Sequence, residues 1–379
     1  FYQQWWPHLF IDCHTTDGSI HGYDLTFDTS RNNTHLFPRV QKASHRLLAR
    51  VCKRVEKRTG FRGQWYGNFP QEESPDSGWQ TYPPLPRFGS HYRGLLGRLD
   101  VLLETYSYIP FERRCQVIYA YLEELLRTAA KRADDLKQAC EGDLQAVLHR
   151  GKVSHPRALV GIQHGVAHRT ADGSLTFRYP TLSLGDTIGI RSFDVESLKA
   201  RAYPGKEPRL YEKLPHLRHT LPQVSVETPS AYLVTAPGAV ADRLSQHGIG
   251  FERLEADWTV EVESYAVLAM EKTFSPDVAA AVPPPGQAEV PLSARPPPVR
   301  FETVLSVRSE RRTATFPKGT LVVRTSQRSG TLAVYLLEPH GDDSLARWEA
   351  FDAHVQVGAY FPVHRLPHGG AVPPRTTVE

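Results

Sequence analysis

The chain of 379 residues has little cysteine, no long apolar run and almost no excess of charge of either sign. Its cysteines, Cys13, Cys52, Cys115 and Cys140, lie far apart without a Cys-x-x-Cys pair, so the sequence does not predict a disulfide framework. No apolar run reaches the roughly 18 residues that a membrane-spanning helix needs. The sequence therefore predicts no integral membrane segment.

The charge balance argues against one class of partner. The chain has 45 Lys and Arg against 41 Asp and Glu, a net charge of +4. A protein that binds nucleic acid by neutralising phosphates usually carries a larger excess, so we expect no nucleic-acid partner. The stretch from Arg39 to Arg62 is locally basic, but its apolar residues recur at helical spacing. This pattern favours a solvated helix face over a binding patch for an anionic partner.

Strand-like and helix-like segments alternate over the first 150 residues. Apolar runs at residues 8–13 and 99–103 are typical of buried strands, and helical spacing predicts helices over residues 43–59 and 111–136. Residues 63–90, rich in Gly, Pro and aromatic residues, indicate a long structured loop. Together these segments predict the α/β class, with a mainly parallel or mixed sheet flanked by helices.

After Gly151 the pattern changes to short alternating segments between turns. Residues 320–325 and 332–337 both indicate strands, residues 231–254 a small α/β patch, and the proline-rich residues 283–298 an exposed connection. We therefore expect two domains, one at residues 1–150 and a β-rich one at residues 151–379.

Two polar residues end apolar strand-like runs. His14 follows the first run, where a side chain could ligate a metal or simply hydrogen-bond its loop. Glu104 follows the second, where a carboxylate could transfer a proton or form an ion pair with Arg113 or Arg114. The residues alone leave these alternatives open. A further pair, His216 and His219, lies in a loop-like stretch without an acidic or Cys partner nearby and is interpreted as incidental.

A family resemblance covers most of the chain. The segment from Phe10 to Gly18 and on to Tyr23 resembles the part of zinc carboxypeptidases, of the metallocarboxypeptidase A-like family, that supplies the third zinc ligand. The segment from Tyr92 to Tyr108 resembles the last catalytic strand of that family with its general-base glutamate. The C-terminal half, with residues 336–339 and 348–352, is similar to the β-rich region of bacterial members.

The resemblance implies a zinc-dependent hydrolase that cleaves C-terminal residues from peptides. It implies His14 as a zinc ligand and Glu104 as the catalytic base, with Tyr92, Tyr82 and Arg98 as substrate-binding candidates. It also implies an extracytoplasmic location. We expect His14 and Glu104 to face one cavity within about 8 Å of each other, and residues from about 155 onward to supply neither a zinc ligand nor a proton-transfer group.

Two motifs of that family are missing. The chain contains no His-x-x-Glu, which supplies the other two ligands, and no Asn-Arg pair at the place where the family binds the substrate carboxylate. Because the chain begins at Phe1 and runs almost directly into a strand, we expect truncation to have removed both motifs and any targeting signal. The chain as given should bind zinc poorly and lack peptidase activity. A zinc-dependent deacylase or amidase on the same scaffold and a catalytically dead binding module remain alternatives.

Overall fold

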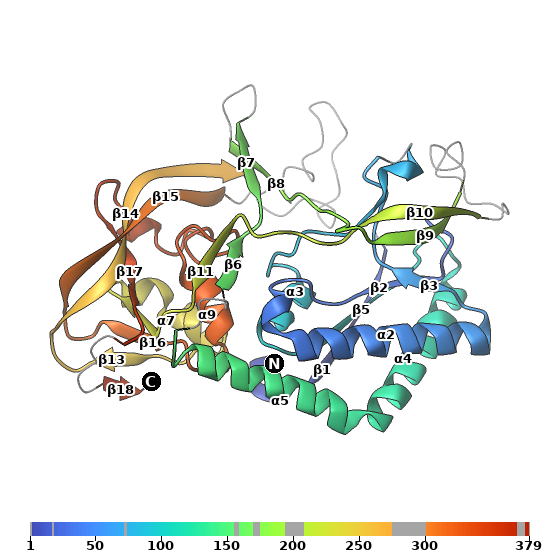
Figure 1. The fold of residues 1–379 in the computed structure, drawn as a ribbon, viewed down its shortest axis with the longest axis horizontal. Helices are drawn as coiled ribbons and strands as arrows, with labels where there is room; N and C mark the ends of the chain where they lie inside the picture. Colours follow the sequence, from blue (N-terminus) through green and yellow to red (C-terminus); the bar gives the residue numbers. More distant parts are fainter. Residues whose placement is uncertain are drawn as a thin grey trace. The chain divides into compact units, whose positions relative to one another are not determined.

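The computed structural model describes residues 2–16, 19–71, 74–154, 159–169, 175–193, 208–274, 301–369 and 376–378. These residues form two compact units (Figure 1). Unit 1 comprises Phe1–Gln145 and Pro180–Leu221, and unit 2 comprises Ala146–Tyr179 and Pro222–Glu379. Residues 180–221 therefore belong with the N-terminal unit, whereas the sequence analysis assigned everything after residue 150 to one domain.

Unit 1 is built on a mixed four-stranded sheet in the order β1-β5-β2-β3. Strand β1 (Leu9–Thr15) is parallel to β5 (Leu99–Thr105), β2 (Leu25–Asp28) is antiparallel to β5, and β3 (Gly63–Trp65) is parallel to β2. Strand β5 is buried except for the half-buried Glu104, because apolar residues on both faces need cover on both sides. The mixed sheet with helices confirms the predicted α/β class.

Helices α2 (Pro38–Thr59) and α4 (Phe111–Lys131) pack against each other and against β5. Pro38 suits the first turn of α2, where no backbone N–H bond is lost. Gly60 ends this helix in the left-handed conformation, with φ 78° and its N–H bonded to the Glu56 carbonyl. This confirms the predicted helix, which begins five residues earlier than expected.

The second predicted helix is two helices. Helix α4 stops at Lys131, Arg132 leaves helical geometry, and α5 (Ala133–Arg150) begins directly after it. The helical spacing continues across this break, so the sequence pattern did not reveal it. Asp134 and Asp135 in the first turn of α5 favour a new helix start, because carboxylates stabilise the positive N-terminal end of the helix dipole.

Residues 63–90 form mainly loop, as predicted, with short elements inside it. A second sheet in unit 1 has the order β4-β10-β9. Its strands are β4 (Trp79–Gln80), β10 (Arg209–Leu217) and β9 (Thr187–Ser192). Buried side chains of these strands pack with two residues from outside the sheet and form a core of Tyr23, Phe69, Trp79, Ile190, Tyr211 and Leu214. The unit also contains α1 (Tyr2–Trp5), α3 (Gly89–Leu95) and 3-10 turns at Thr34–Leu36 and Pro75–Ser77.

Unit 2 is organised around an antiparallel sheet in the order β15-β14-β17-β12-β16-β13-β18. The strands are β12 (Ala231–Val234), β13 (Glu252–Leu254), β14 (Trp258–Phe274), β15 (Phe301–Phe316), β16 (Leu321–Arg324), β17 (Tyr360–Leu366) and β18 (Thr376–Val378). Two-stranded pairs join β6 (Leu159–Gln163) with β11 (Val224–Glu227) and β7 (Val166–Arg169) with β8 (Leu175–Arg178). The β-rich C-terminal half is confirmed.

One strand prediction in unit 2 is wrong. Residues 332–337 lie in helix α9 (Gly330–Leu337), whose eight residues are all buried. A short continuous apolar run fits a buried helix as well as a buried strand, and here complete burial removes the alternation that tells them apart. The predicted strand at residues 320–325 is β16. The predicted patch at residues 231–254 contains β12, α7 (Pro237–Gln246) and β13. The proline-rich residues 283–298 lie outside the described residues.

No helix in the described parts of the chain is both long enough and apolar enough to cross a membrane. None of the four cysteines forms a disulfide.

Candidate functional site

His14 and Glu104 lie opposite each other on β1 and β5. The parallel register pairs Leu9 with Leu99 and, five residues further on, His14 with Glu104. Register partners on neighbouring strands project from the same face of a sheet, and the strands lie about 4.8 Å apart. The two side chains therefore leave the same face at the carboxyl ends of both strands, whereas their sharing of one cavity stays a prediction. Their chemical roles stay predictions.

A series of charged contacts fixes the position of the His14 ring. Its Nε2 lies 2.9 Å from Asp12 Oδ1. Because an ionised carboxylate only accepts hydrogen bonds, Nε2 is the donor, and Nδ1 is the ring nitrogen left for another partner. Asp12 Oδ2 accepts a 2.8 Å bond from Arg93 Nη2, and Arg93 Nε binds the fully buried Asp100. The Arg93 guanidinium, from α3, thus links β1 to β5 through Asp12 and Asp100, which precede His14 and Glu104 on their strands. The His14 side chain is 51% exposed.

One proposed ion-pair partner of Glu104 has another carboxylate. Arg113 directs both Nε and Nη2 at Asp24 Oδ1, at 2.9 and 2.7 Å. Arg114, the other proposed partner, lies over the Phe111 ring with 5.5 Å from Cζ to the ring centroid. Glu104 itself is half-buried at the end of β5.

The three predicted substrate contacts lie in different surroundings. Tyr92 on α3 is half-buried, and its hydroxyl receives a 3.3 Å bond from Gln3 Nε2. Arg98 is 2% exposed, with Cζ 4.8 Å from the centroid of the Trp6 ring. Tyr82 packs against His91, with ring centroids 4.9 Å apart. The structure does not bring these three side chains together as one group, so their roles in substrate binding stay predictions.

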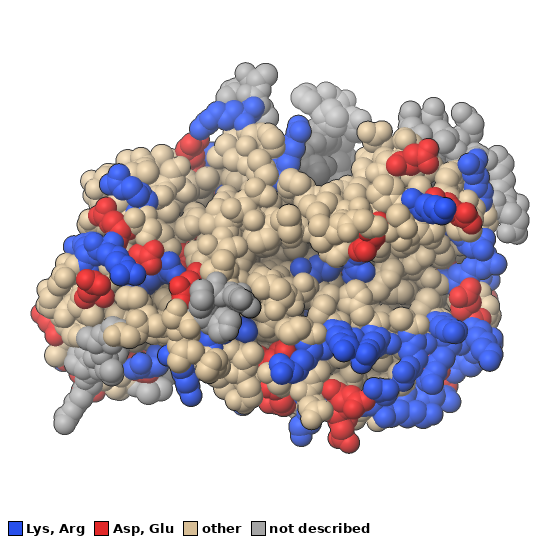
Figure 2. All heavy atoms as spheres, viewed as in Figure 1, with Lys and Arg blue, Asp and Glu red and all other residues tan. Residues whose placement is uncertain are grey.

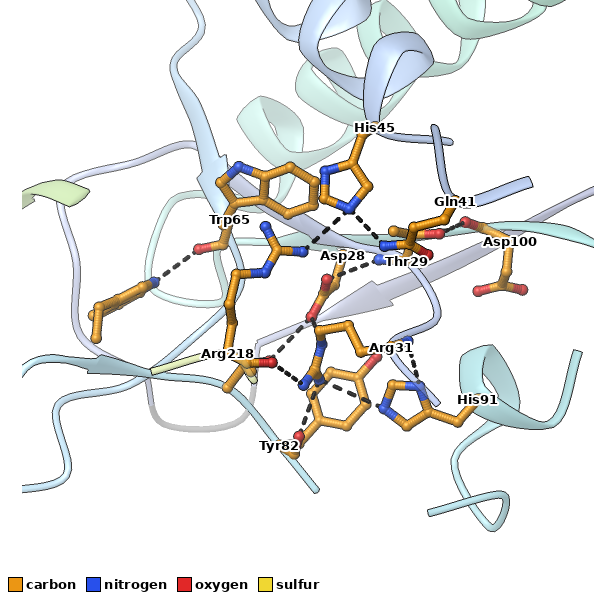
Figure 3. A network of polar contacts seen from close by, with 12 residues as sticks. Asp28, Thr29, Arg31, Gln41, His45, Trp65, Tyr82, His91, Asp100 and Arg218 are labelled. Atoms are coloured by element: carbon orange, nitrogen blue, oxygen red, sulfur yellow. Dashed lines mark hydrogen bonds and ion pairs between the residues drawn. The ribbon is translucent and has the colours of Figure 1, made fainter. Parts of the chain in front are cut away.

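Tyr82 belongs to a polar network centred on Asp28 at the end of β2 (Figure 3). Asp28 is 2% exposed, and its carboxylate accepts from Thr29 N at 2.8 Å, Thr81 Oγ1 at 3.0 Å and Arg31 Nε at 3.1 Å. Arg31 also donates to the Tyr82 and Arg218 carbonyls, at 3.0 and 3.3 Å. Through this buried guanidinium the network connects segments that are more than 180 residues apart in the sequence.

Arg218 brings a second positive charge to the same network. Its guanidinium lies over the Trp65 ring, 4.3 Å from the centroid, and its Nη2 is 3.4 Å from His45 Nε2 (Figure 3). Burial lowers the pKa of Arg218, and the neighbouring Arg31 lowers it further. Burial also lowers the pKa of His45 to about 4, with Arg218 adding to the effect, so this imidazole is neutral at pH 7.

The network connects to β5 at Asp100, near the start of the strand whose carboxyl end carries Glu104. Thr29 Oγ1 donates a 2.7 Å bond to the Asp100 carbonyl, and the Asp100 carboxylate is held by Arg93. The sequence analysis missed Asp12, Asp28, Arg31 and Arg93 as site residues. The available signal was that Asp28, like His14 and Glu104, follows directly after apolar strand residues.

The expectation that His216 lies in a loop and that His219 has no acidic partner is wrong, whereas the interpretation of the pair as incidental stays a prediction. His216 lies in β10, and burial together with Arg218 lowers its pKa to about 4. His219 Nε2 lies 2.7 Å from Asp186 Oδ2. The sequence could not reveal this acidic partner because it is 33 residues away on another loop.

Throughout the described ranges, no three His, Cys, Asp or Glu side chains gather into a group that could hold a metal ion. Zinc in proteins takes three or four protein ligands. His14 offers one imidazole nitrogen, and its neighbour Asp12 is already bound by Arg93. The described residues therefore do not complete a zinc site, and any further ligands have to come from elsewhere.

No protein-family model, curated protein or solved structure matches this chain.

Proposed function

We propose that this chain belongs to a zinc-dependent hydrolase of the metallocarboxypeptidase type, which removes C-terminal residues from peptides. The observation that carries the proposal is the register match of His14 with Glu104 at the ends of two parallel strands. This match brings an imidazole and a carboxylate to the carboxyl ends of two neighbouring strands, which supports the proposed roles of zinc ligand and proton-transfer group. Such pairs perform hydrolysis in which a carboxylate activates water.

In this proposal Glu104 is the group that moves the proton. Its carboxylate takes a proton from the attacking water and then gives it to the nitrogen of the departing amine. His14 contributes Nδ1 as one zinc ligand, and the other ligands come from outside the described residues. Asp12 orients the His14 ring, and Arg93 holds Asp12 in turn. A hydrogen-bonded carboxylate behind an imidazole ligand is the usual way in which proteins fix its ring and tautomer.

The substrate class rests on the resemblance of the sequence, and the contacts proposed for Tyr92, Tyr82 and Arg98 rest on it as well. An acyl amide is the main alternative substrate, because the same two groups would also cleave it. Comparing a blocked dipeptide that has a free C-terminal carboxylate with the corresponding C-terminal amide separates the two. A peptidase needs the carboxylate, whereas an amidase does not.

The test uses the complete product of the gene, purified with zinc. Glu104→Gln should lower kcat on the blocked dipeptide by about 10²-fold or more and leave the zinc content unchanged. His14→Ala should lower the zinc content itself. The control is Glu56→Gln, since Glu56 is exposed on α2. If Glu104→Gln retains full turnover, or if a chelator leaves turnover unchanged, the proposal is wrong.

A further inference from the structure

Helix α2 carries a row of basic side chains along one face. Every third or fourth residue is basic and exposed, so these side chains fall in a narrow arc of the helix surface. We refer to Arg39, Lys42, Arg46, Arg50, Lys53 and Lys57 as the basic row. At 1.5 Å per residue the row is about 27 Å long. Figure 2 shows Lys and Arg covering this part of the surface almost without interruption.

Most of this charge is not neutralised within the described chain. Arg39 pairs with Asp143. The other five members of the row form no ion pair with a described residue, and Glu56 is the only acidic residue of α2. By contrast, the arginines on the side of α2 that faces α4 are paired, Arg54 with Glu124 at 3.1 Å and Arg58 with Glu123 at 2.9 Å. The positive charge is thus concentrated on the outward face.

Helix α4 presents a second, apolar row beside the basic one. Phe111, Tyr119 and Leu126 are 73%, 70% and 59% exposed. Together with the exposed Cys115 they lie on one side of the helix, and we refer to these four residues as the apolar row. Because α2 and α4 run side by side in opposite directions over β5, the two rows belong to one layer of unit 1.

A groove lies between the C-terminal end of α2 and the apolar row. Its volume is about 670 Å³, and its wall includes Thr59, Phe61, Cys115 and Tyr119. Arg58 lines the same groove, as do Glu112 and Glu123. Large apolar side chains that stay exposed next to a groove commonly mark a contact surface.

We propose that α2 and α4 form a peripheral binding surface for an anionic lipid bilayer. The basic row contacts acidic headgroups, where each Lys or Arg near the surface adds to the attraction. The apolar row enters the interface, where aromatic side chains are stabilised. This inference concerns a face away from His14 and Glu104, whose side chains leave the sheet on the side of α3, and it does not depend on the proposed hydrolysis.

The separation of the two rows favours a bilayer over a nucleic acid. Single-stranded nucleic acid binds where aromatic rings and cations alternate along one path, so that bases stack between phosphate contacts. Here the basic row lies on α2 and the exposed rings lie on α4, where Arg114 also contacts the Phe111 ring. A bilayer requires this segregation of charge from apolar side chains, because headgroups and acyl chains occupy different depths.

The experiment is co-sedimentation of the full chain with phosphatidylcholine vesicles, with and without phosphatidylserine. We expect binding only with phosphatidylserine, and weaker binding as salt rises. Five substitutions to Gln in the basic row, at Lys42, Arg46, Arg50, Lys53 and Lys57, should weaken binding by about 100-fold or more. The control removes the same charge from exposed residues of unit 2, at Arg243, Arg308, Arg311, Lys318 and Arg328. This control should bind nearly as well as the unsubstituted chain.

A second variant tests the apolar row, with circular dichroism used to verify folding. Phe111→Ser combined with Tyr119→Ser should weaken vesicle binding by about 10-fold or more while keeping its salt dependence. Equal binding to both kinds of vesicle, or equal loss in the unit 2 control, overturns the proposal. Two further results together also overturn the proposal. One is tight binding of single-stranded DNA that depends on the basic row and competes fully with vesicles. The other is normal vesicle binding by the double serine variant.

Discussion

Arg93 of α3 holds Asp12 of β1 through a 2.8 Å ion pair between Nη2 and Oδ2. The same guanidinium binds Asp100 of β5, and its side chain is only 11% exposed. Its Cζ also lies 4.1 Å from the centroid of the Phe10 ring. A single cation therefore compensates two carboxylates on neighbouring strands. The ion pair with Arg93 fixes the position of Asp12, and Asp12 is in turn hydrogen-bonded to His14 Nε2.

Replacing Arg93 by Met should destabilise the protein by about 3–5 kcal/mol, because it leaves the carboxylate of Asp100 buried without its cation. The matched control is Arg127→Met, which removes an exposed i,i+4 pair with Glu123. This change should stay within about 0.5 kcal/mol. Urea denaturation followed by circular dichroism measures both. Similar midpoints for the two variants would contradict the role given to Arg93.

A buried carboxylate in unit 2 gives a second prediction. Glu338 has no exposed surface and accepts hydrogen bonds from Tyr232 at 2.6 Å and Tyr265 at 2.5 Å. Tyr232→Phe leaves this carboxylate with one donor fewer and should cost about 1–3 kcal/mol. Tyr360→Phe removes a hydroxyl that bonds Glu310 at the surface and should leave the thermal midpoint unchanged. Equal midpoints for the two variants would show that the Tyr232 bond contributes nothing.

Two helix glycines of unit 2 should respond in opposite ways to alanine. A Cβ at Gly330, the first residue of α9, would overlap the backbone carbonyl oxygen of Thr325. Because a backbone atom cannot rotate away, Gly330→Ala should destabilise by about 1–3 kcal/mol. A Cβ at Gly238 in α7 meets no atom within 4 Å, so Gly238→Ala should stabilise slightly, by about 0.5 kcal/mol. Thermal unfolding of both variants tests the contrast.

The buried histidines of unit 1 predict a loss of stability in mild acid. Burial lowers the pKa of His21 to about 3, and burial with Arg218 lowers that of His45 to about 4. In the unfolded chain both return to about 6.5. Between these values the unfolded state binds more protons than the folded state, so stability falls as pH drops from about 6.5 towards 4. His45→Gln should reduce this slope, whereas His35→Gln, at an exposed position, should not. Urea midpoints at several pH values measure the difference.

The sequence was informative where a single segment carries the signal. The apolar runs before His14 and Glu104 predict two strands, and the structure contains both as the parallel pair β1 and β5. The prediction that both are buried is wrong for β1, which is half-buried to exposed along its whole length because it is the first strand of the sheet and has a neighbour on one side only. The Asp28 network could not be predicted in the same way. Its arginines, Arg31 and Arg218, are 187 residues apart, and the second lies in a stretch assigned to the other domain. Local sequence patterns do not encode such contacts, because these contacts form only when segments far apart in the sequence are brought together by the fold.

Helix α9 has a consequence for what happens when unit 2 unfolds. The segment from Leu332 to Leu337 contains no charged residue and no proline, and its Val, Tyr and Leu residues suit a strand as well as a helix. In the folded protein all of them are buried, which prevents contact with other chains. Once exposed, such a segment pairs readily with copies of itself into intermolecular β-structure. Thermal unfolding of unit 2 is therefore expected to be irreversible, and Val334→Lys in the heated chain should slow aggregation measured by light scattering.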